Sequence, residues 1–304
     1  MTMRTWVCGL VAAVTVTMPA QAEVLRVAGI YPARADEAAF VNRLAVESLG
    51  GRDGPALAFA IEDELNDVIV DQRPWFQVIP NGAGADAVLR GFASLDMRTS
   101  KITRSKKVCV EEDEKGKCVR KENRKIDCRN LDYVLSPDLR LTARDGQPLY
   151  SSSHLSERKT LTVCPDDKEP SRSSVARELA GRIAKTLRDD LAPDDRVDDV
   201  RVLEKRDGLS KDDGERFKQA LRLTKSDPAA ACRVWQDLAQ TNPTQIATAF
   251  NVALCAEAAG DDAQARALYE RLLSVASVSE ARDRLKAIDD RERGARQLRE
   301  HNRS

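Results

Sequence analysis

The 304-residue sequence predicts an α+β domain, with a mixed, mainly antiparallel sheet and two packing helices, followed by an all-α helical-repeat domain. Three observations support this fold class. Short apolar and β-branched runs bounded by Pro, Gly or Asn recur through the first two thirds of the chain. Two stretches there have helical apolar periodicity, and the later composition is alanine-rich and repetitive. The expected boundaries are residues 1–22 for a leader, 23–203 for the α+β domain and 204–304 for the helical domain.

The first 22 residues predict a secretory signal peptide. Arg4 precedes an apolar stretch, and Ala20-Gln21-Ala22 forms a small-residue cleavage site. The apolar stretch is too short for a spanning helix, and Cys8 within it lacks the residues that precede a lipidated cysteine. We therefore expect a periplasmic mature chain that begins near Glu23, with no transmembrane segment.

The charge balance argues against a nucleic-acid partner. The chain has 49 basic and 49 acidic residues, and removal of Arg4 with the signal peptide leaves 48 against 49, a net charge of −1. Nucleic-acid-binding domains normally carry a clear basic excess. Protein partners are the expectation for the chain as a whole.

Four runs in the first domain predict strands: VLRVAGIYP, NRLAVESLGG, WFQVIP and ADAVLRGFASL. Two helical stripes accompany them, the first formed by Leu57, Ile61, Leu65 and Val68, and the second by Val175, Leu179, Ile183 and Leu187. Ser171 to Ser174 are candidate caps for the second helix. Both helices are expected to pack on the sheet.

A long hairpin follows from period-two alternation. The alternating apolar positions are Leu131, Tyr133, Leu135, Leu139, Leu141 and Ala143. Asp145-Gly146 is a hairpin turn signal. Pro137 interrupts the outgoing strand and is expected to mark a bulge or an edge, because proline cannot donate to the ladder.

This order of elements resembles the TolB amino-terminal domain and the soluble part of the curli secretion channel family. The matching segments are LAVESLGGRDGPALAFAIEDEL, WFQVIP followed by ADAVLRG, and LRLTARDGQPLYSS. The resemblance spans roughly Val24 to Leu191 and implies an envelope assembly or adaptor role. One departure excludes a channel: residues 98–129 carry twelve basic and six acidic side chains, which lipid-facing strands cannot hold. This charged hairpin could instead contact an acidic partner or lipid headgroups.

The second domain repeats with a period of 34 residues. That offset relates Ala231 to Ala265, Trp235 to Tyr269 and Leu238 to Leu272. It is the period of the tetratricopeptide repeat, and FNVALCAEAAGDDAQARALYERLL resembles that family. A final charged segment suits a solvating cap. The resemblance implies a peptide-binding groove, for which the inward candidates are Arg216, Ala220, Leu223, Phe250, Leu254 and Glu257. The alternative is that several of these residues only pack.

Six cysteines outside the signal peptide predict three disulfides in an oxidising compartment. Cys109 and Cys118 flank a tight turn, with Val110 expected opposite Lys117. A hairpin centred on Asp145-Gly146 brings Cys128 to within one residue of Cys164, which a bulge near Pro137 would absorb. Cys232 and Cys255 remain, on adjacent antiparallel helices. A zinc site is the alternative, but no Cys-x-x-Cys spacing occurs.

Motifs for catalysis are weak, and we expect neither an enzyme nor a bound cofactor or metal. GAGADA at residues 82–87 resembles a dinucleotide fingerprint but is not followed by a helical pattern. His154 and His301 are the only histidines, and both are expected to be exposed. The function expected is an exported scaffold or adaptor for envelope or secretion-assembly proteins. The alternative is a periplasmic small-ligand-binding or sensor protein, with the ligand in the α+β domain.

Overall fold

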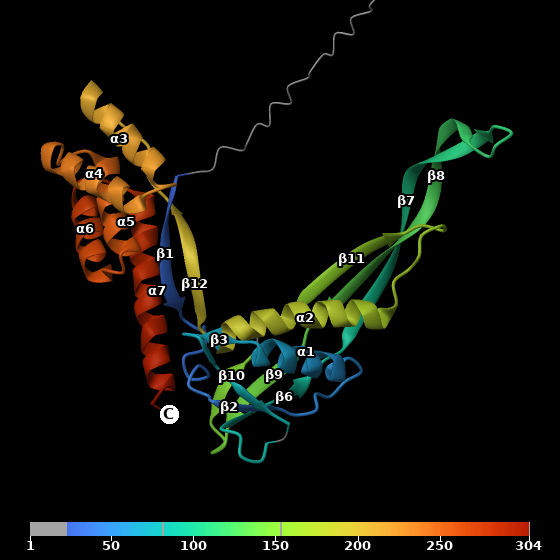
Figure 1. Cartoon of the computed structure of the whole chain (residues 1–304). Coiled ribbons are helices and arrows are strands. Elements are labelled where there is room, and N and C mark those ends of the chain that lie inside the picture. The colour runs from blue at the N-terminus through green and yellow to red at the C-terminus, as the bar shows by residue number, and fades with distance from the viewer. Residues whose placement is uncertain (1–22, 81, 153, 304) are drawn as a thin grey trace, which may run out of the picture. The chain divides into compact units, whose positions relative to one another are not determined.

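The computed structural model describes residues 23–80, 82–152 and 154–303 (Figure 1). The predicted signal peptide lies outside these residues. Contacts divide the chain into two compact units: residues up to Val27 with Asp198–Arg282, and Ala28–Val197 with Asp283–Ser304. We call these the helical unit and the α+β unit. Over the described residues the chain is mixed α+β with seven helices, and none of these helices combines the length and apolar composition needed to cross a membrane.

A five-stranded sheet forms part of the α+β unit, in the order β10-β9-β6-β2-β5. Its strands are β2 (Arg43–Val46), β5 (Gln77–Ile79), β6 (Ala87–Phe92), β9 (Asp138–Ala143) and β10 (Pro148–Ser151). β2 runs parallel to β5 and β6, whereas β6, β9 and β10 pair antiparallel. This sheet thus has two parallel and two antiparallel pairings, and the predicted mixed, mainly antiparallel character is confirmed only when the other sheets are included.

A second, three-stranded sheet has the order β11-β8-β7 and is antiparallel throughout. Its strands are β7 (Leu95–Glu112), β8 (Cys118–Leu135) and β11 (Glu157–Val163). The chain passes between the two sheets at Pro137, where β8 has ended and β9 has not begun. Proline cannot donate to a ladder, so the break separates two sheets. The interruption was predicted; the change of sheet was not.

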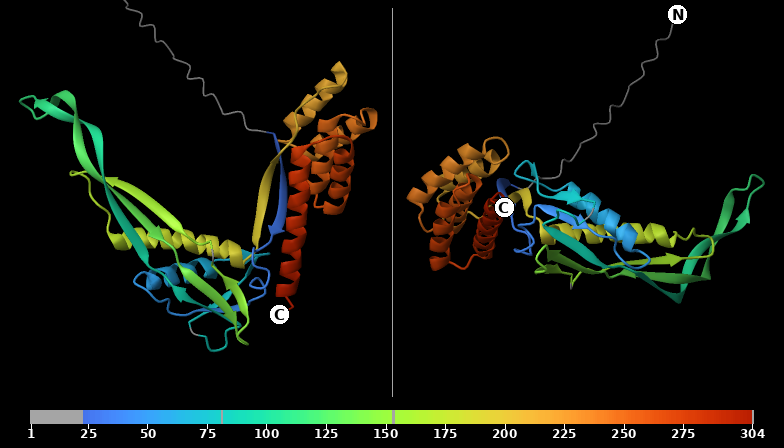
Figure 2. Two further views of the ribbon diagram at one scale, coloured as in Figure 1. Left: turned by 180° about the vertical axis from the view of Figure 1, so that it is seen from behind. Right: turned by 90° about the horizontal axis from the view of Figure 1, so that it is seen from below.

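The predicted apolar faces form the core of the α+β unit. Leu131, Tyr133, Leu135, Leu139 and Leu141 are all buried. The helices α1 (Gly54–Asn66) and α2 (Arg172–Leu191) lie side by side, as Figure 2 shows, and bury the two predicted stripes. The Ser171 side chain accepts a hydrogen bond from the backbone N–H of Ser174, which confirms the predicted cap.

Most of α7 (Ser279–His301), from Asp283 onward, belongs to the α+β unit, although the sequence grouped it with the helical domain. The Gln297 amide oxygen accepts from the Ala33 backbone N–H at 2.8 Å. A side chain at Gly294 would meet the Ile30 carbonyl at 2.1 Å, so the helix packs there backbone to backbone. Its charged composition had suggested a solvating cap.

The helical unit contains two helical pairs that repeat. Its helices are α3 (Lys211–Leu223), α4 (Pro228–Thr241), α5 (Ile246–Ala258) and α6 (Asp262–Val275). Both ends of α6 lie 34 residues after those of α4, and the capping side chains Asp227 and Asp261 have the same offset. All six residues of the predicted 34-residue pattern are buried.

Two further pairs of strands complete the fold. β1 (Val24–Tyr31) pairs with β12 (Asp194–Arg201), and β3 (Ile69–Val70) pairs with β4 (Arg73–Pro74), each as a two-stranded sheet. Within the α+β unit, the Arg196 guanidinium lies over the Tyr31 ring, 3.9 Å from its centroid. This contact holds the end of β12 against β1 by cation–π attraction.

Candidate binding surface on a basic hairpin

All three predicted disulfides are present: Cys109–Cys118, Cys128–Cys164 and Cys232–Cys255. The first two lie in the α+β unit and the third joins α4 to α5. Their pairing fits an extracytoplasmic protein, because such bonds form and persist in oxidising compartments.

The register at the tip of the hairpin differs from the prediction. Cys109 lies opposite Lys121 and Cys118 opposite Glu112, so the two cysteines are not directly opposed. Irregularities on both sides of Glu111 reduce the distance along the strands between Cys109 and Cys118, so that their sulfur atoms can bond. Asp113 closes the turn, because its carboxylate accepts from the backbone N–H groups of Lys115 and Lys117.

Cys128 and Cys164 bond as predicted, but the irregularity in the strands that brings them together lies elsewhere than predicted. Val163 pairs with Arg129, which places Cys164 and Cys128 next in line at the end of β11. The bulge expected near Pro137 is instead an irregularity between Pro148 and Tyr150 in the β9–β10 hairpin. Proline at the start of β10 disrupts the ladder there because it lacks an N–H donor.

Beyond the end of β11, β7 and β8 continue as a two-stranded ribbon of residues 102–112 and 118–128, hereafter the ribbon (Figure 1). A two-stranded hairpin is marginally stable by itself in water. Here one disulfide, Cys109–Cys118, joins the two strands near the turn, and a second, Cys128–Cys164, ties the base of β8 to the end of β11. The ribbon is therefore held as an ordered projection.

Ion pairs near the base neutralise some of its charge. The Lys106 ammonium lies 3.4 Å from the Asp166 carboxylate, and Arg129 pairs with Glu169 at 2.9 Å. The Arg104 guanidinium donates to the Thr162 hydroxyl at 3.0 Å. These partners come from β11 and the loop that follows it, so they reach only the lower part of the ribbon.

One face of the ribbon carries Lys107, Lys121 and Lys125, hereafter the lysine face, whereas Arg104 and Lys106 lie on the other face. Lys107 lies directly opposite Asn123, and the other two lysines flank Asn123 on the same side of β8. All three side chains are exposed, and among the described residues no carboxylate lies within ion-pair distance of them. Diagonal neighbours across a strand pair are about 7–8 Å apart, so three like charges are held close together.

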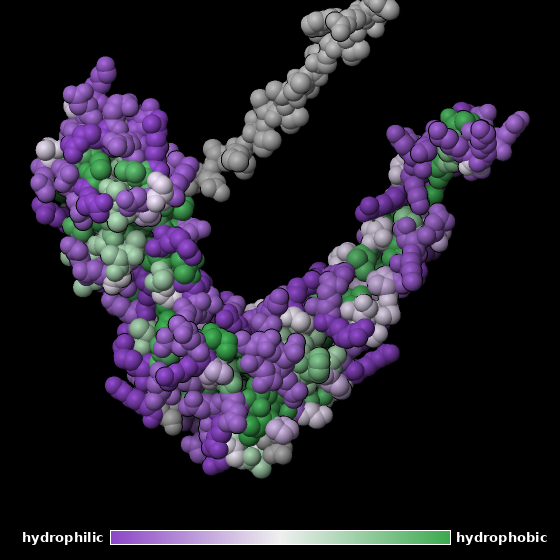
Figure 3. Space-filling model, in the orientation of Figure 1, coloured by the Kyte–Doolittle hydropathy of each residue, from purple (hydrophilic) through white to green (hydrophobic). Residues whose placement is uncertain are grey.

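The ribbon is hydrophilic over most of its visible surface, as Figure 3 shows. Residues 98–129 have a net charge of +6 and contain no Phe, Tyr or Trp. Nucleic-acid strands are bound through aromatic stacking platforms as well as positive charge. The surface therefore suits an anionic partner whose binding does not require aromatic stacking.

The structure places the predicted groove residues mostly inside the helical unit. Ala220, Phe250, Leu254 and Glu257 are buried. The remaining two candidates are on the surface: Arg216 is exposed and Leu223 is partly exposed. For the four buried residues, the packing alternative describes what is observed.

Glu257 illustrates how the buried candidates contribute to packing. Its carboxylate accepts a hydrogen bond from the Tyr269 hydroxyl at 2.9 Å, inside the core. Arg216 forms ion pairs with Asp213 and Asp237. Another cavity, of about 420 Å³, is lined mainly by residues of α4 and α5, with Leu25 of β1 and Gln264 and Leu268 of α6.

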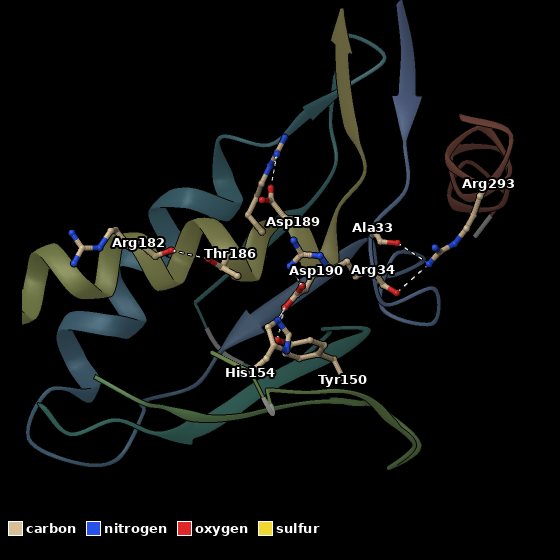
Figure 4. Close-up of polar contacts among 10 residues, drawn as sticks. Ala33, Arg34, Tyr150, His154, Arg182, Thr186, Asp189, Asp190 and Arg293 are labelled. Atoms are coloured by element: carbon tan, nitrogen blue, oxygen red, sulfur yellow. Dashed lines mark hydrogen bonds and ion pairs between the residues drawn. The ribbon is translucent and has the colours of Figure 1, made fainter. Parts of the chain in front are cut away.

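A polar cluster that the sequence did not predict surrounds Asp190, which is buried at the end of α2 (Figure 4). Arg34 contacts one carboxylate oxygen at 2.9 Å, and Tyr150 and His154 contact the other at 2.6 and 3.0 Å. Burial, together with the hydrogen bond to Asp190, raises the pKa of Tyr150, so the phenol stays protonated and donates. His154 is exposed, as expected, but is bound to this carboxylate.

The cluster joins α2 to β10 and to the loop after β1, so we interpret its role as stabilising the fold. Both carboxylate oxygens are already occupied by donors from the chain itself. Within the part of the chain that the structure describes, no group of three His, Cys, Asp or Glu side chains is arranged to hold a metal ion.

No family model and no curated protein matches the sequence. Among solved structures, a PelC dodecamer from Paraburkholderia phytofirmans is 18% identical, with a TM-score of 0.22, over 57% of this chain and 98% of that one. A candidate lipoprotein from Caulobacter crescentus CB15 is 16% identical, with a TM-score of 0.21, over 52% of this chain and 90% of that one. The resemblances to the TolB, curli-channel and tetratricopeptide families stay predictions.

Proposed function

We propose that the protein is a non-catalytic extracytoplasmic adaptor or scaffold that holds envelope or secretion-assembly proteins together, with the lysine face of the ribbon as its main contact surface. The observation that carries this proposal is the combination of two disulfides with three exposed lysines that have no carboxylate partner in the part of the chain that the structure describes. Interface surfaces that meet an oppositely charged partner gain association rate and specificity from such unpaired charge.

A purely structural role for the ribbon accounts less well for its sequence. Of its residues only Cys128 is buried, so the ribbon adds little to the core. Close like charges oppose folding slightly, whereas a neutral hairpin would avoid this cost. Two cross-links that order such a segment are expected where its surface is used.

The helical unit supplies a second contact region in this proposal. Its repeated helices and caps support a tetratricopeptide-like arrangement of two units. The buried positions of Phe250 and Leu254 argue against the groove predicted from them. In this proposal, a peptide contacts exposed surfaces of the helical unit that do not include these buried residues.

A small-ligand carrier or sensor is the second candidate. A polar cavity of about 340 Å³ at the base of the ribbon supports it, lined by residues that include Lys101, Asp127 and Glu169. Its size is at the lower end for ligand pockets. A screen of anionic metabolites by thermal shift tests this candidate, and a stabilisation that Lys101→Ala removes would favour it over the scaffold.

Photo-crosslinking in the native envelope tests the scaffold proposal. A photoreactive phenylalanine analogue replaces Ser105 or Asn123 on the ribbon, and Phe59, an exposed residue of α1, serves as the matched control position. We expect discrete protein adducts from the ribbon positions and fewer from position 59. Absence of protein adducts at both ribbon positions, with normal export of the chain, would contradict the proposal.

A further inference from the structure

β7 is an edge strand. In the order β11-β8-β7 it has a neighbour on one side only, and among the described residues nothing pairs with its other side. It is 18 residues long, and its register with β8 is regular from Leu95 to Cys109. A strand of this kind presents a row of unpaired backbone N–H and C=O groups.

The edge lacks the devices that make strand pairing impossible. It contains no proline, and its irregularities are confined to the last residues before the turn. What it carries is positive charge: Lys101, Arg104, Lys106 and Lys107. Charge of one sign prevents two copies from pairing edge to edge, because their lysines would face each other. The same charge favours a strand of opposite sign.

We propose that the outer edge of β7 accepts an extended acidic segment of a partner protein as an added β-strand. This inference rests on the proposed function and deepens it by naming the chemistry of the partner and the mode of contact. Backbone hydrogen bonds to the edge supply affinity in such complexes, and alternate side chains supply specificity.

The register between β7 and β8 determines which side chains of β7 lie beside each position of the added strand. On one face its side chains lie beside Lys101, Thr103, Ser105 and Lys107, so acidic and hydroxyl side chains fit there. On the other face they lie beside Ile102 and Val108, which are partly exposed, with Arg104 and Lys106 between them. An alternating acidic segment with a few β-branched residues satisfies both faces.

A flat anionic lipid surface fits less well. The end of the ribbon is acidic, with Glu111, Glu112, Asp113 and Glu114 in succession. Glu111 is neutralised by Arg120, but among the described residues no ion pair reaches Glu112 or Glu114. A tip of this kind is repelled by anionic headgroups, whereas a strand lying along the regular part of β7, up to Cys109, ends before the acidic residues.

The test uses the full mature chain and a synthetic dodecapeptide of alternating Glu and Thr. A control peptide has the same sequence with alternate backbone nitrogens methylated, which keeps the charge but removes ladder donors. Affinity is measured by fluorescence anisotropy at two salt concentrations. We expect the unmodified peptide to bind with an affinity that falls as salt rises, and the methylated peptide to bind at least tenfold more weakly.

Two variants locate the contact. The triple variant K101E/R104E/K107E reverses three exposed basic residues of β7 that lie beside the added strand, and should weaken peptide binding about tenfold, the loss expected for three exposed charge pairs. The matched variant K185E/K211E/K286E reverses three exposed lysines outside the ribbon and should bind normally. Hydrogen exchange should show peptide-dependent protection of β7 backbone amides over residues 102–109.

Several results would overturn strand addition: equal affinity of the two peptides, no binding of either, or protection confined to β8. Ribbon-dependent binding to vesicles with anionic lipid, in place of peptide binding, would assign the surface to lipid headgroups. These results leave the scaffold proposal standing if the crosslinking positions at Ser105 and Asn123 still give protein adducts. If the adducts also fail, the scaffold proposal fails independently.

Discussion

His301 lies in the last turn of α7, buried against Trp75 with its ring stacked at a centroid distance of 3.6 Å. The backbone carbonyl of Ala39 lies 3.1 Å from its Nδ1 atom. The expectation that this residue is exposed was wrong. It sits among charged residues near the end of the sequence, and no local pattern reveals a contact with residues more than 200 positions away.

The protonation of His301 predicts a pH dependence of stability. Burial lowers its pKa in the folded chain, so the neutral ring is favoured and the unfolded chain binds more protons below its ordinary pKa of about 6.5. Stability is full above that value and falls as the pH decreases through it. We expect urea unfolding of the α+β unit to have a lower midpoint at pH 5.5 than at pH 7.5.

The variant His301→Phe keeps a ring against Trp75 and removes the titration, so the difference between the two pH values should shrink. His154→Gln is the control, because it removes the only other histidine. An unchanged pH dependence in His301→Phe would contradict the assignment.

Asp190 is a buried carboxylate that binds three side chains. Asp190→Ala leaves the Tyr150 hydroxyl without its acceptor and removes the partner of Arg34 and His154. Loss of one side of a buried charged network typically costs about 3 kcal/mol. We expect that loss in the free energy of unfolding of the α+β unit. Asp189→Ala, next to it on an exposed ion pair with Arg188, should cost less than about 1 kcal/mol.

At the scale of elements, the two ribbon disulfides should have separable effects. Cys128–Cys164 ties the base to the end of β11, whereas Cys109–Cys118 closes only the turn region. We expect the double variant C109S/C118S to leave the melting temperature of the unit within a few degrees while accelerating amide exchange near the turn. C128S/C164S should accelerate exchange along the whole ribbon. Identical exchange patterns would contradict this division.

Local periodicity explains which elements were predictable. The alternation through Leu131 and Tyr133 gave the strand face, and the stripe through Leu179 and Ile183 gave α2, because each pattern reports burial directly. The tip register was mispredicted, since the irregularities beside Glu111 depend on turn geometry that alternation does not record. The disulfide pairing was nevertheless correct, because a small register error still leaves the same cysteines adjacent.

The candidate surface was predicted in part. The charge of residues 98–129 was evident, but which of its basic side chains are paired depends on the loop after β11, where Asp166 pairs with Lys106 and Glu169 with Arg129. The groove assigned to Phe250 and Glu257 was transferred by analogy. Helical position alone does not distinguish an inward packing face from an open concave face.

At the scale of the whole molecule, association should respond to salt. A partner held by exposed lysines is screened at high ionic strength, because the Debye length falls from about 10 Å at 0.1 M to about 3 Å at 1 M. We expect pull-down of envelope partners by the mature chain to weaken steeply over this range. The K107E/K121E/K125E variant should lose both the binding and most of its salt dependence, as measured by surface plasmon resonance with a captured partner.

The stapled ribbon also sets a reach. Eleven residues of β7 extend past the point where β11 ends, which at about 3.3 Å per residue corresponds to roughly 36 Å. A flexible loop of the same length would sample many end positions, whereas a ribbon cross-linked near its turn and tied to β11 at its base acts as a spacer of nearly constant length. A partner bound near the turn is thereby held at a distance from the sheet and from α2. Binding then depends on the size of the partner as well as on its charge.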